Sequence, residues 1–193
     1  MTEWLFSEVA PQAAYLENNW SCPPDLTRSQ CGAFLLYTHY LLFSNGGRYD
    51  IKLNMQDITE QHAVTLCGSN GCEWVDYSAP GNILFGFLSA ARGIPQPLSW
   101  FVGGLREQAD LLEHGQPLNF TYAPSLLDNP GDKAAVDTGY ALYNRFGVDI
   151  TWAEFQSALT PDVLDSFQPP AAYPAELPLP QPNQYPPGFF LNQ

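Results

Sequence analysis

Residues 27–43 read TRSQCGAFLLYTHYLLF, a dense apolar segment with a helix-start signal at its head. Thr27 can cap the first turn, and Gln30 stands at the position where a capping box requires Glu or Gln. The segment is followed by Asn45-Gly46-Gly47, which is typical of a helix end. Because it is apolar nearly all round, we expect it to be the buried helix at the centre of the fold.

Periodic apolar positions and capping residues predict further helices on both sides of this segment. The expected helices cover residues 7–18 (interrupted at Pro11), 56–66, 82–91, 98–114, 133–146 and 151–159. We expect Asp132 to cap the fifth of these and Thr151, with Glu154, the last. Short extended segments are expected near residues 51–55 and 73–77. The sequence therefore predicts a mainly α fold, with one compact helical domain over residues 1–168.

Residues 169–193 differ in composition, because they are rich in proline and cannot form a helix. One interpretation is an extended strap that lies on the core through Tyr185, Phe189 and Phe190. The other is a proline-rich ligand for a partner protein. We favour the strap, because aromatic residues in a free tail would form exposed apolar surface.

The chain is strongly acidic. Its 193 residues include 20 Asp or Glu and 7 Lys or Arg, for a net charge of −13. Such a chain repels polyanions at long range, and nucleic-acid binding needs several basic contacts to phosphate. No apolar run reaches the length of a membrane span. We therefore expect neither nucleic acid nor a membrane among the partners.

The four cysteines fall into two local pairs, Cys22 with Cys31 and Cys67 with Cys72. Two disulfides are the favoured interpretation; buried thiols or a metal site are the alternatives, and the spacing does not fit a usual zinc site. Disulfides indicate an oxidising compartment, so we expect a secreted or periplasmic protein. The N-terminal residues lack the basic start of a signal peptide. Either a signal was removed, or export uses another route, or the protein stays inside the cell.

Three stretches combine glycine with carboxylate or amide groups beside apolar positions. They are residues 49–52 (YDIK), 80–86 (PGNILFG) and 131–133 (GDK), the last followed by Asp137, Gly139 and Tyr143. Glycines allow a backbone to come close, and polar groups gathered next to them indicate a site.

In these stretches the chain resembles the polymorphic toxin type 44 domain family, over roughly residues 48–147. The counterparts of the family motifs are residues 49–52, residues 81–86, Gly93, Gln108, and residues 131–133 with Asp137. Phe85 stands where the family has tyrosine, Lys133 where it has an acid, and Ile51 where it has an aromatic residue. The resemblance implies a toxin-like or secreted enzyme, either a nuclease or an enzyme that attacks cell-wall glycan.

The residue types favour sugar over phosphate. A glycosidase needs two carboxylates at the scissile bond, and sugars stack on aromatic rings. The chain offers the aromatic residues Trp74, Tyr77, Phe85, Phe87 and Trp100. A metal-independent RNase instead needs a base, an acid and a cation for the phosphate. Lys52 can supply the cation, but His39 and His62 lie in apolar segments that are typical of core histidines.

The candidate catalytic residues are Asp50, Lys52, Glu60 and Asp76. In an extended segment Asp50 and Lys52 share one face, which favours the charged carboxylate and suits a nucleophile or base. Glu60 is then the best candidate acid. The candidate substrate-binding residues are Trp74, Asn82, Phe85, Gln108, Asp132 and Asp137.

Several of these residues also have purely structural interpretations. Asp132 and Asn82 can cap helices, and Asp137 can pair with Lys133 four residues earlier. Gly86 and Gly93 can serve close packing. Glu60 can lie on a solvated helix face.

The leading hypothesis is a secreted hydrolase that cleaves the glycan of bacterial peptidoglycan, a muramidase-like activity without a cofactor or metal. Glycan strands would be its partner, with an immunity protein as a further one. The second hypothesis is a metal-independent RNase toxin, and the third is a non-catalytic binding module that uses the proline-rich tail.

Overall fold

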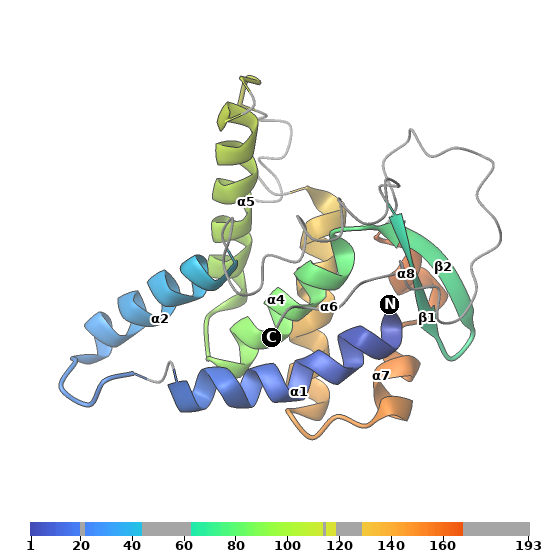
Figure 1. The fold of residues 1–193 in the computed structure, drawn as a ribbon, viewed down its shortest axis with the longest axis horizontal. Helices are drawn as coiled ribbons and strands as arrows, with labels where there is room; N and C mark the ends of the chain where they lie inside the picture. Colours follow the sequence, from blue (N-terminus) through green and yellow to red (C-terminus); the bar gives the residue numbers. More distant parts are fainter. Residues whose placement is uncertain (20–21, 44–62, 114, 119–128, 168–193) are drawn as a thin grey trace.

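A computed structural model describes residues 1–19, 22–43, 63–113, 115–118 and 129–167. Within these ranges the fold is mainly α, as predicted, with seven helices and one two-stranded sheet (Figure 1). The helices are α1 (Thr2–Asn19), α2 (Arg28–Phe43), α4 (Ala79–Ala91), α5 (Gln96–Glu113), α6 (Pro130–Phe146), α7 (Trp152–Ala158) and α8 (Pro161–Asp165). The strands are β1 (Ala63–Gly68) and β2 (Gly71–Asp76). The predicted extended segment at 51–55 and the tail 169–193 lie outside the described residues.

Helix α4 is the centre of the fold, and it packs against α6, α1 and α5 (Figure 1). Ile83, Leu84, Phe87 and Leu88 on this helix are completely buried. They belong to a core that also takes side chains from α1, both strands, α6, α7 and α8. A helix that is apolar all round must be covered on several sides, and α4 fulfils that requirement.

We predicted that residues 27–43 form the buried helix at the centre of the fold. They do form a helix, but most of it is not buried. The helix itself is present as α2, but Thr38, His39 and Leu42 are its only buried residues. Tyr37 on the opposite face is 63% exposed. Apolar composition alone did not distinguish α2 from α4, which has the small residues that close helix contacts require.

Helices α4 and α6 meet backbone to backbone at two glycines. A Cβ on Gly86 would lie 2.1 Å from the carbonyl oxygen of Val136, and one on Gly139 would lie 2.1 Å from that of Ile83. No side chain fits at either position. The packing interpretation of Gly86 is therefore correct, whereas Gly93 follows the last turn of α4 with a φ of 68°.

Helix α1 extends further than predicted. It begins at Thr2 and continues through Pro11, which is exposed. Leu5, Val9 and Leu16 lie on both sides of the proline and are almost fully buried against the core. This apolar stripe explains why the helix continues, since tertiary packing supplies most helical stability in proteins.

The predicted helix over residues 56–66 is wrong at its C-terminal end, because residues 63–68 form β1. This strand pairs antiparallel with β2, with Cys67 opposite Cys72. The cross-strand disulfide Cys67–Cys72 closes the hairpin. The four residues Ala63 to Leu66 are all buried, so a pattern read as a helix face belongs to a strand covered on both sides.

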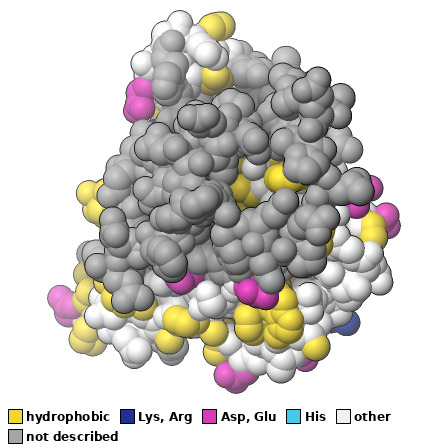
Figure 2. Space-filling view, turned by 45° about the vertical axis from the view of Figure 1, so that its right-hand side comes forward, with side chains coloured by type: hydrophobic (Ala, Val, Ile, Leu, Met, Phe, Trp, Pro, Cys, Tyr) yellow, Lys and Arg dark blue, Asp and Glu magenta, His cyan; other side chains and the backbone are white. Residues whose placement is uncertain are grey.

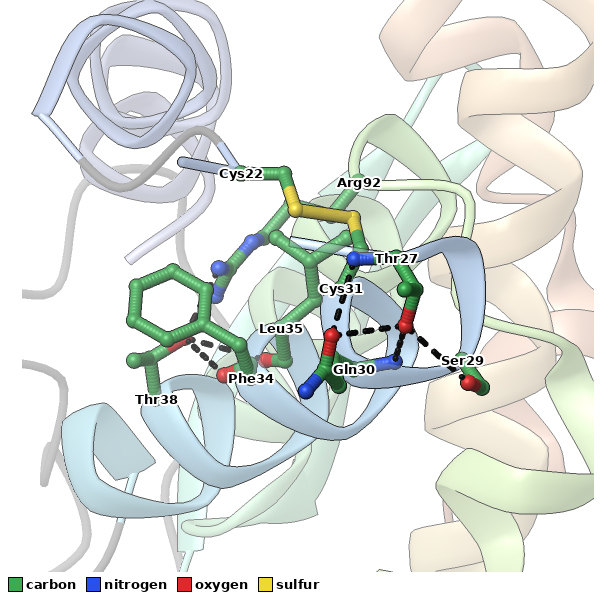
Figure 3. The surroundings of a disulfide bond; sticks show 9 residues. All are labelled: Cys22, Thr27, Ser29, Gln30, Cys31, Phe34, Leu35, Thr38 and Arg92. Carbon is green, nitrogen blue, oxygen red and sulfur yellow. Dashed lines mark hydrogen bonds between the residues drawn. A yellow bond between two sulfur atoms is a disulfide. The ribbon is translucent and has the colours of Figure 1, made fainter. Parts of the chain in front are cut away.

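Local capping signals are mostly correct. The side chains and backbone of Thr27 and Gln30 form the predicted box at the start of α2, next to the disulfide Cys22–Cys31 (Figure 3). Thr151 and Glu154 form the capping box of α7. None of the helices in the described ranges is long and apolar enough to cross a membrane.

Candidate functional site

The first polar cluster lies where β2 leads into α4. Asp76, at the end of β2, accepts a hydrogen bond from the backbone N–H of Ser78 through Oδ1 at 2.7 Å. The hydroxyl of Ser78 donates to Oδ1 of Asp132 on α6 at 2.6 Å. The amide Nδ2 of Asn82 donates to the same Asp132 oxygen. Three predicted site residues, Asp76, Asn82 and Asp132, are thus brought together around Ser78.

Two predicted caps are corrected by this cluster. Asn82 does not begin a helix, because α4 starts one turn earlier at Ala79. Asp132 is not the cap of α6 either, since Asn129 holds that position and accepts from the Gly131 N–H. Both side chains instead take part in a hydrogen bond that joins α4 to α6, and the carboxylate of Asp132 is half-buried.

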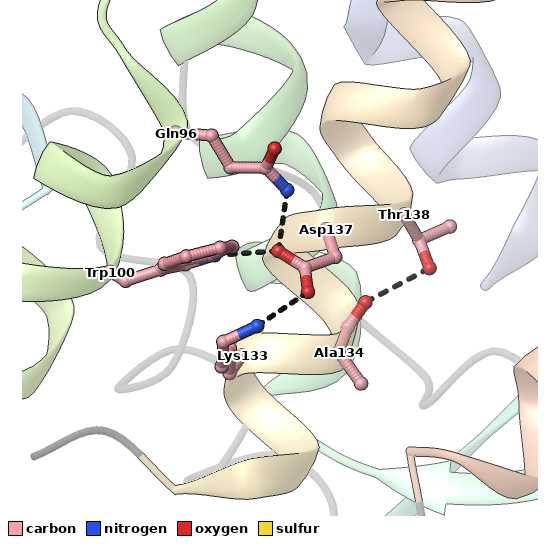
Figure 4. A network of polar contacts seen from close by, with 6 residues as sticks. All are labelled: Gln96, Trp100, Lys133, Ala134, Asp137 and Thr138. Atoms are coloured by element: carbon pink, nitrogen blue, oxygen red, sulfur yellow. Dashed lines mark hydrogen bonds and ion pairs between the residues drawn. The ribbon is translucent and has the colours of Figure 1, made fainter. Parts of the chain in front are cut away.

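The second polar cluster joins α5 to α6 around Asp137 (Figure 4). Oδ1 of Asp137 accepts from Gln96 Nε2 at 2.7 Å and from the indole N–H of Trp100. Oδ2 is paired with Lys133 Nζ at 2.8 Å, as the four-residue spacing predicted. The Lys133 ammonium also lies 3.7 Å from the centre of the Trp100 ring. One carboxylate therefore holds an aromatic ring and a cation in fixed positions.

The two clusters occupy different sides of α6. Asp132 and Asp137 are five residues apart, which corresponds to about 7.5 Å along the axis and about 140° around it. Asp132 faces the start of α4, whereas Asp137 faces α5. Helix geometry therefore does not make these two carboxylates a converging pair.

A buried polar network fixes α5 against α6 beside the second cluster. The Tyr140 hydroxyl donates to the Ile94 carbonyl at 2.8 Å and lies 2.7 Å from the Ser99 hydroxyl. The pKa of Tyr140 is raised above its ordinary value, mainly because the hydroxyl is buried. Because Ser99 adjoins Trp100, this network helps to hold the indole next to Asp137.

Phe85 lies inside an aromatic cluster. Its ring is 8% exposed and lies 4.9 Å from the rings of His39 and Phe43. In this structure Phe85 therefore packs α4 against α2. Phe87, another aromatic residue considered for sugar stacking, is fully buried in the main core.

His39 is the buried core histidine that the sequence favoured. Its Nε2 lies 2.7 Å from the hydroxyl of Ser89, and both residues are at most 1% exposed. Burial, and secondarily the Arg92 charge, lower the pKa of His39 to about 3. The imidazole is thus neutral under ordinary conditions, which suits a structural role.

The remaining predicted residues are not placed in either cluster. Trp74 is half-buried in β2 opposite Thr65, and Gln108 is buried on α5. Asp50, Lys52 and Glu60 lie outside the described residues, as does His62.

The two described residues that flank positions 44–62 are Phe43 and Ala63. Phe43 lies in the aromatic cluster, and Ala63 lies next to the first polar cluster. Phe43, the last residue of α2, packs on Phe85 of α4. Ala63, the first residue of β1, pairs with Asp76 in the sheet. The described chain thus ends at Phe43, beside Phe85 of α4, and resumes at Ala63, opposite Asp76.

Acidic side chains predominate on the described surface that one view shows. Acidic side chains are visible around the margin of Figure 2, where basic ones are scarce. Lys133 is paired with Asp137, and Arg106 lies 3.7 Å from Glu113. Within the described ranges, no group of three or more His, Cys, Asp or Glu residues has the arrangement of a metal site.

The sequence did not predict that Ser78 and Gln96 belong to the polar clusters. It suggested Trp100 only as an aromatic surface for sugar stacking. A signal for Ser78 exists, because a serine two residues before Pro80 is typical of a helix start. Recognising it would have started α4 at the correct residue. Gln96 has no comparable signal, since its role depends on where α6 lies.

Comparisons with protein-family models, with curated proteins and with solved structures found no match.

Proposed function

We propose that the protein is an extracytoplasmic, toxin-like hydrolase that cleaves glycosidic bonds in bacterial peptidoglycan, with a muramidase-like use of carboxylates. The observation that carries this proposal is the cluster at Asp137, where a carboxylate, an indole ring and an amide side chain lie together between α5 and α6. Carboxylates with aromatic surface are the groups that glycoside hydrolases use. The two disulfides support an oxidising compartment.

The proposed roles follow from the sequence and the two clusters. Asp50 acts as nucleophile or base, and Glu60 acts as the proton donor. Asp76 and Asp132 are alternative carboxylates for the pair, because the chain carrying Asp50 and Glu60 re-enters the fold opposite Asp76. Trp100 contributes stacking surface through the ring face opposite Lys133, and the second N–H of Gln96 Nε2 donates to the sugar.

Phosphate chemistry is less well supported by the described cations. An RNase site needs a cation available to the phosphate, whereas Lys133 is paired with Asp137 and lies on the Trp100 ring. The net charge of −13 opposes the approach of RNA. The RNase hypothesis therefore depends on Lys52.

A zymogram on peptidoglycan, run beside an RNA degradation assay, tests the proposal. We expect muropeptide release with a new reducing end on muramic acid, and intact RNA at physiological salt. Sugar cleavage should depend weakly on salt, whereas RNA binding weakens steeply as counterion release is lost. RNA cleavage that Lys52→Ala abolishes, with intact peptidoglycan, would reverse the ranking.

Three variants locate the carboxylates. Asp50→Asn and Glu60→Gln should each lower glycan cleavage by roughly 100-fold or more, the scale of acid–base contributions. Asp149→Asn is the matched control, because Asp149 is exposed and lies outside both clusters. If Asp50→Asn lowers the melting temperature in parallel with the activity, the role of Asp50 is structural and not catalytic.

A further inference from the structure

The exposed face of α2 is apolar at helical spacing. Ala33, Tyr37, Tyr40 and Leu41 recur at the intervals i, i+4, i+7 and i+8, which form one stripe along a helix. Tyr37 is 63% exposed, Tyr40 40% and Leu41 42%, and Ala33 is also exposed. This stripe lies opposite the buried face of α2.

Helix α2 is held in place although one face is exposed. The disulfide Cys22–Cys31 fastens its N-terminal turn, and Arg92, the residue after α4, donates to the Thr38 hydroxyl at 2.9 Å (Figure 3). His39 and Leu42 are buried further along. Figure 1 shows α2 at the edge of the molecule. The exposed stripe therefore lies on a helix that these contacts hold in place.

The stripe is also the place where the acidic charge is missing. No Asp or Glu occurs between residues 26 and 49, in a chain with 20 acids. The other described helices with exposed surface each contain a carboxylate, whereas α4 has none but is buried. The residues concerned include Glu3 (α1), Glu113 (α5), Asp132 (α6), Glu154 (α7) and Asp162 (α8).

We infer that α2 is a self-association surface, on which the α2 helix of a second copy packs antiparallel about a two-fold axis near Tyr37. A helix is the natural occupant of an apolar stripe at i, i+4 and i+7 spacing. Helix α5 also exposes apolar side chains, at Phe101, Leu105 and Leu112. It also contains Glu107 and Glu113, however, so contact between two α5 helices would bring carboxylates nearer to one another, whereas α2 contains none. At α2 no carboxylates meet, which avoids that local repulsion.

The antiparallel arrangement is self-complementary in size. It sets the small Ala33 of one copy against the bulky Tyr40 and Leu41 of the other, as an isologous interface requires.

Sedimentation equilibrium of the full chain at increasing NaCl tests the inference. We expect a dimer whose Kd falls as salt rises from about 0.01 M to about 1 M, because the Debye length shrinks from about 30 Å to about 3 Å and the repulsion between two −13 chains is screened. A monomer at all concentrations and salts would overturn the inference, as would a dimer that salt dissociates.

Matched variants locate the interface. Tyr37→Lys should weaken the dimer by about tenfold or more, because it places like charges across the two-fold axis. Leu112→Lys introduces the same charge at a leucine on α5 that is 60% exposed, and it should leave Kd unchanged. Loss of the dimer in Leu112→Lys but not in Tyr37→Lys would assign the contact to α5 and refute the inference.

Crosslinking gives a second readout. All four native cysteines are in disulfides, so Tyr37→Cys introduces a single thiol. Oxidation should link two copies through Cys at this position, as seen on a non-reducing gel, and Leu112→Cys should remain unlinked. Equal crosslinking of the two variants would count against the two-fold axis at Tyr37.

Discussion

Gly139 of α6 lies directly against the backbone of Ile83 in α4, so that a Cβ at Gly139 would come within 2.1 Å of the Ile83 carbonyl oxygen. The same crossing aligns the start of α4 with the start of α6. It thereby brings Asn82 within hydrogen-bonding distance of Asp132. The glycines in the motif-like stretches thus position the polar residues beside them.

Substitution at this crossing should be strongly destabilising. We expect Gly139→Ala to lower the free energy of unfolding by about 3 kcal/mol or more, since the neighbouring atoms are backbone and cannot rotate away. Gly32→Ala on α2 is the matched control, because a Cβ there meets nothing within 4 Å. It should raise stability by about 0.5–1 kcal/mol through helix propensity. Urea unfolding of both variants measures the contrast; equal effects would contradict the backbone contact.

The Asp137 cluster should contribute to stability apart from any catalytic role. Asp137→Ala removes the acceptor of Gln96, Trp100 and Lys133, so we expect a loss of about 1–3 kcal/mol in unfolding free energy. The ion pair is a minor part, since both side chains are at least a quarter exposed. A double-mutant cycle with Lys133→Met should give a coupling below about 1 kcal/mol. A larger coupling would show that the pair dominates the cluster.

His39 should make stability depend on pH. Its folded-state pKa of about 3 lies below the ordinary value of 6.5, so the unfolded chain binds a proton first. The contribution is complete above pH 6.5 and is lost as the pH falls towards 3, by up to about 1.4 kcal/mol per unit. His39→Gln should remove this slope, measured as the difference between the two proteins in urea unfolding between pH 6.5 and 5. An unchanged slope would mean that His39 titrates normally.

Both disulfides should be present in the native protein. Thiol alkylation before reduction should leave the cysteines unmodified, as judged by mass spectrometry. Replacing Cys67 and Cys72 together by Ser should cost about 2 kcal/mol, because the loop they close spans only five residues. Four free thiols in protein isolated from its native source would contradict the pairing and remove the support for an extracytoplasmic site.

Several features of this protein were predictable because they depend on residues close in sequence. The caps at Thr27 and Thr151 bond to groups three residues away. Lys133 and Asp137 meet across one helical turn, and the cysteines of each disulfide are near neighbours in the chain. Such contacts need no knowledge of the rest of the fold, so composition and spacing were sufficient for them and for the mainly α class.

The burial of helices and the partners of polar side chains depended on tertiary structure. Helices α2 and α4 are both apolar, yet only α4 is enclosed, because its Gly86 and the facing Gly139 let two backbones touch. Because of that contact, the Asn82 side chain donates a hydrogen bond to Asp132 and does not cap a helix. Residues 63–66 became a strand because β2 supplies its pairing partner, although their apolar pattern also fits a helix. The contacts between α4 and α6 join residues about 50 positions apart in sequence, whereas β1 and β2 are neighbours in a hairpin. In both cases the partner segment, and not the intrinsic propensity of the residues, decides the outcome.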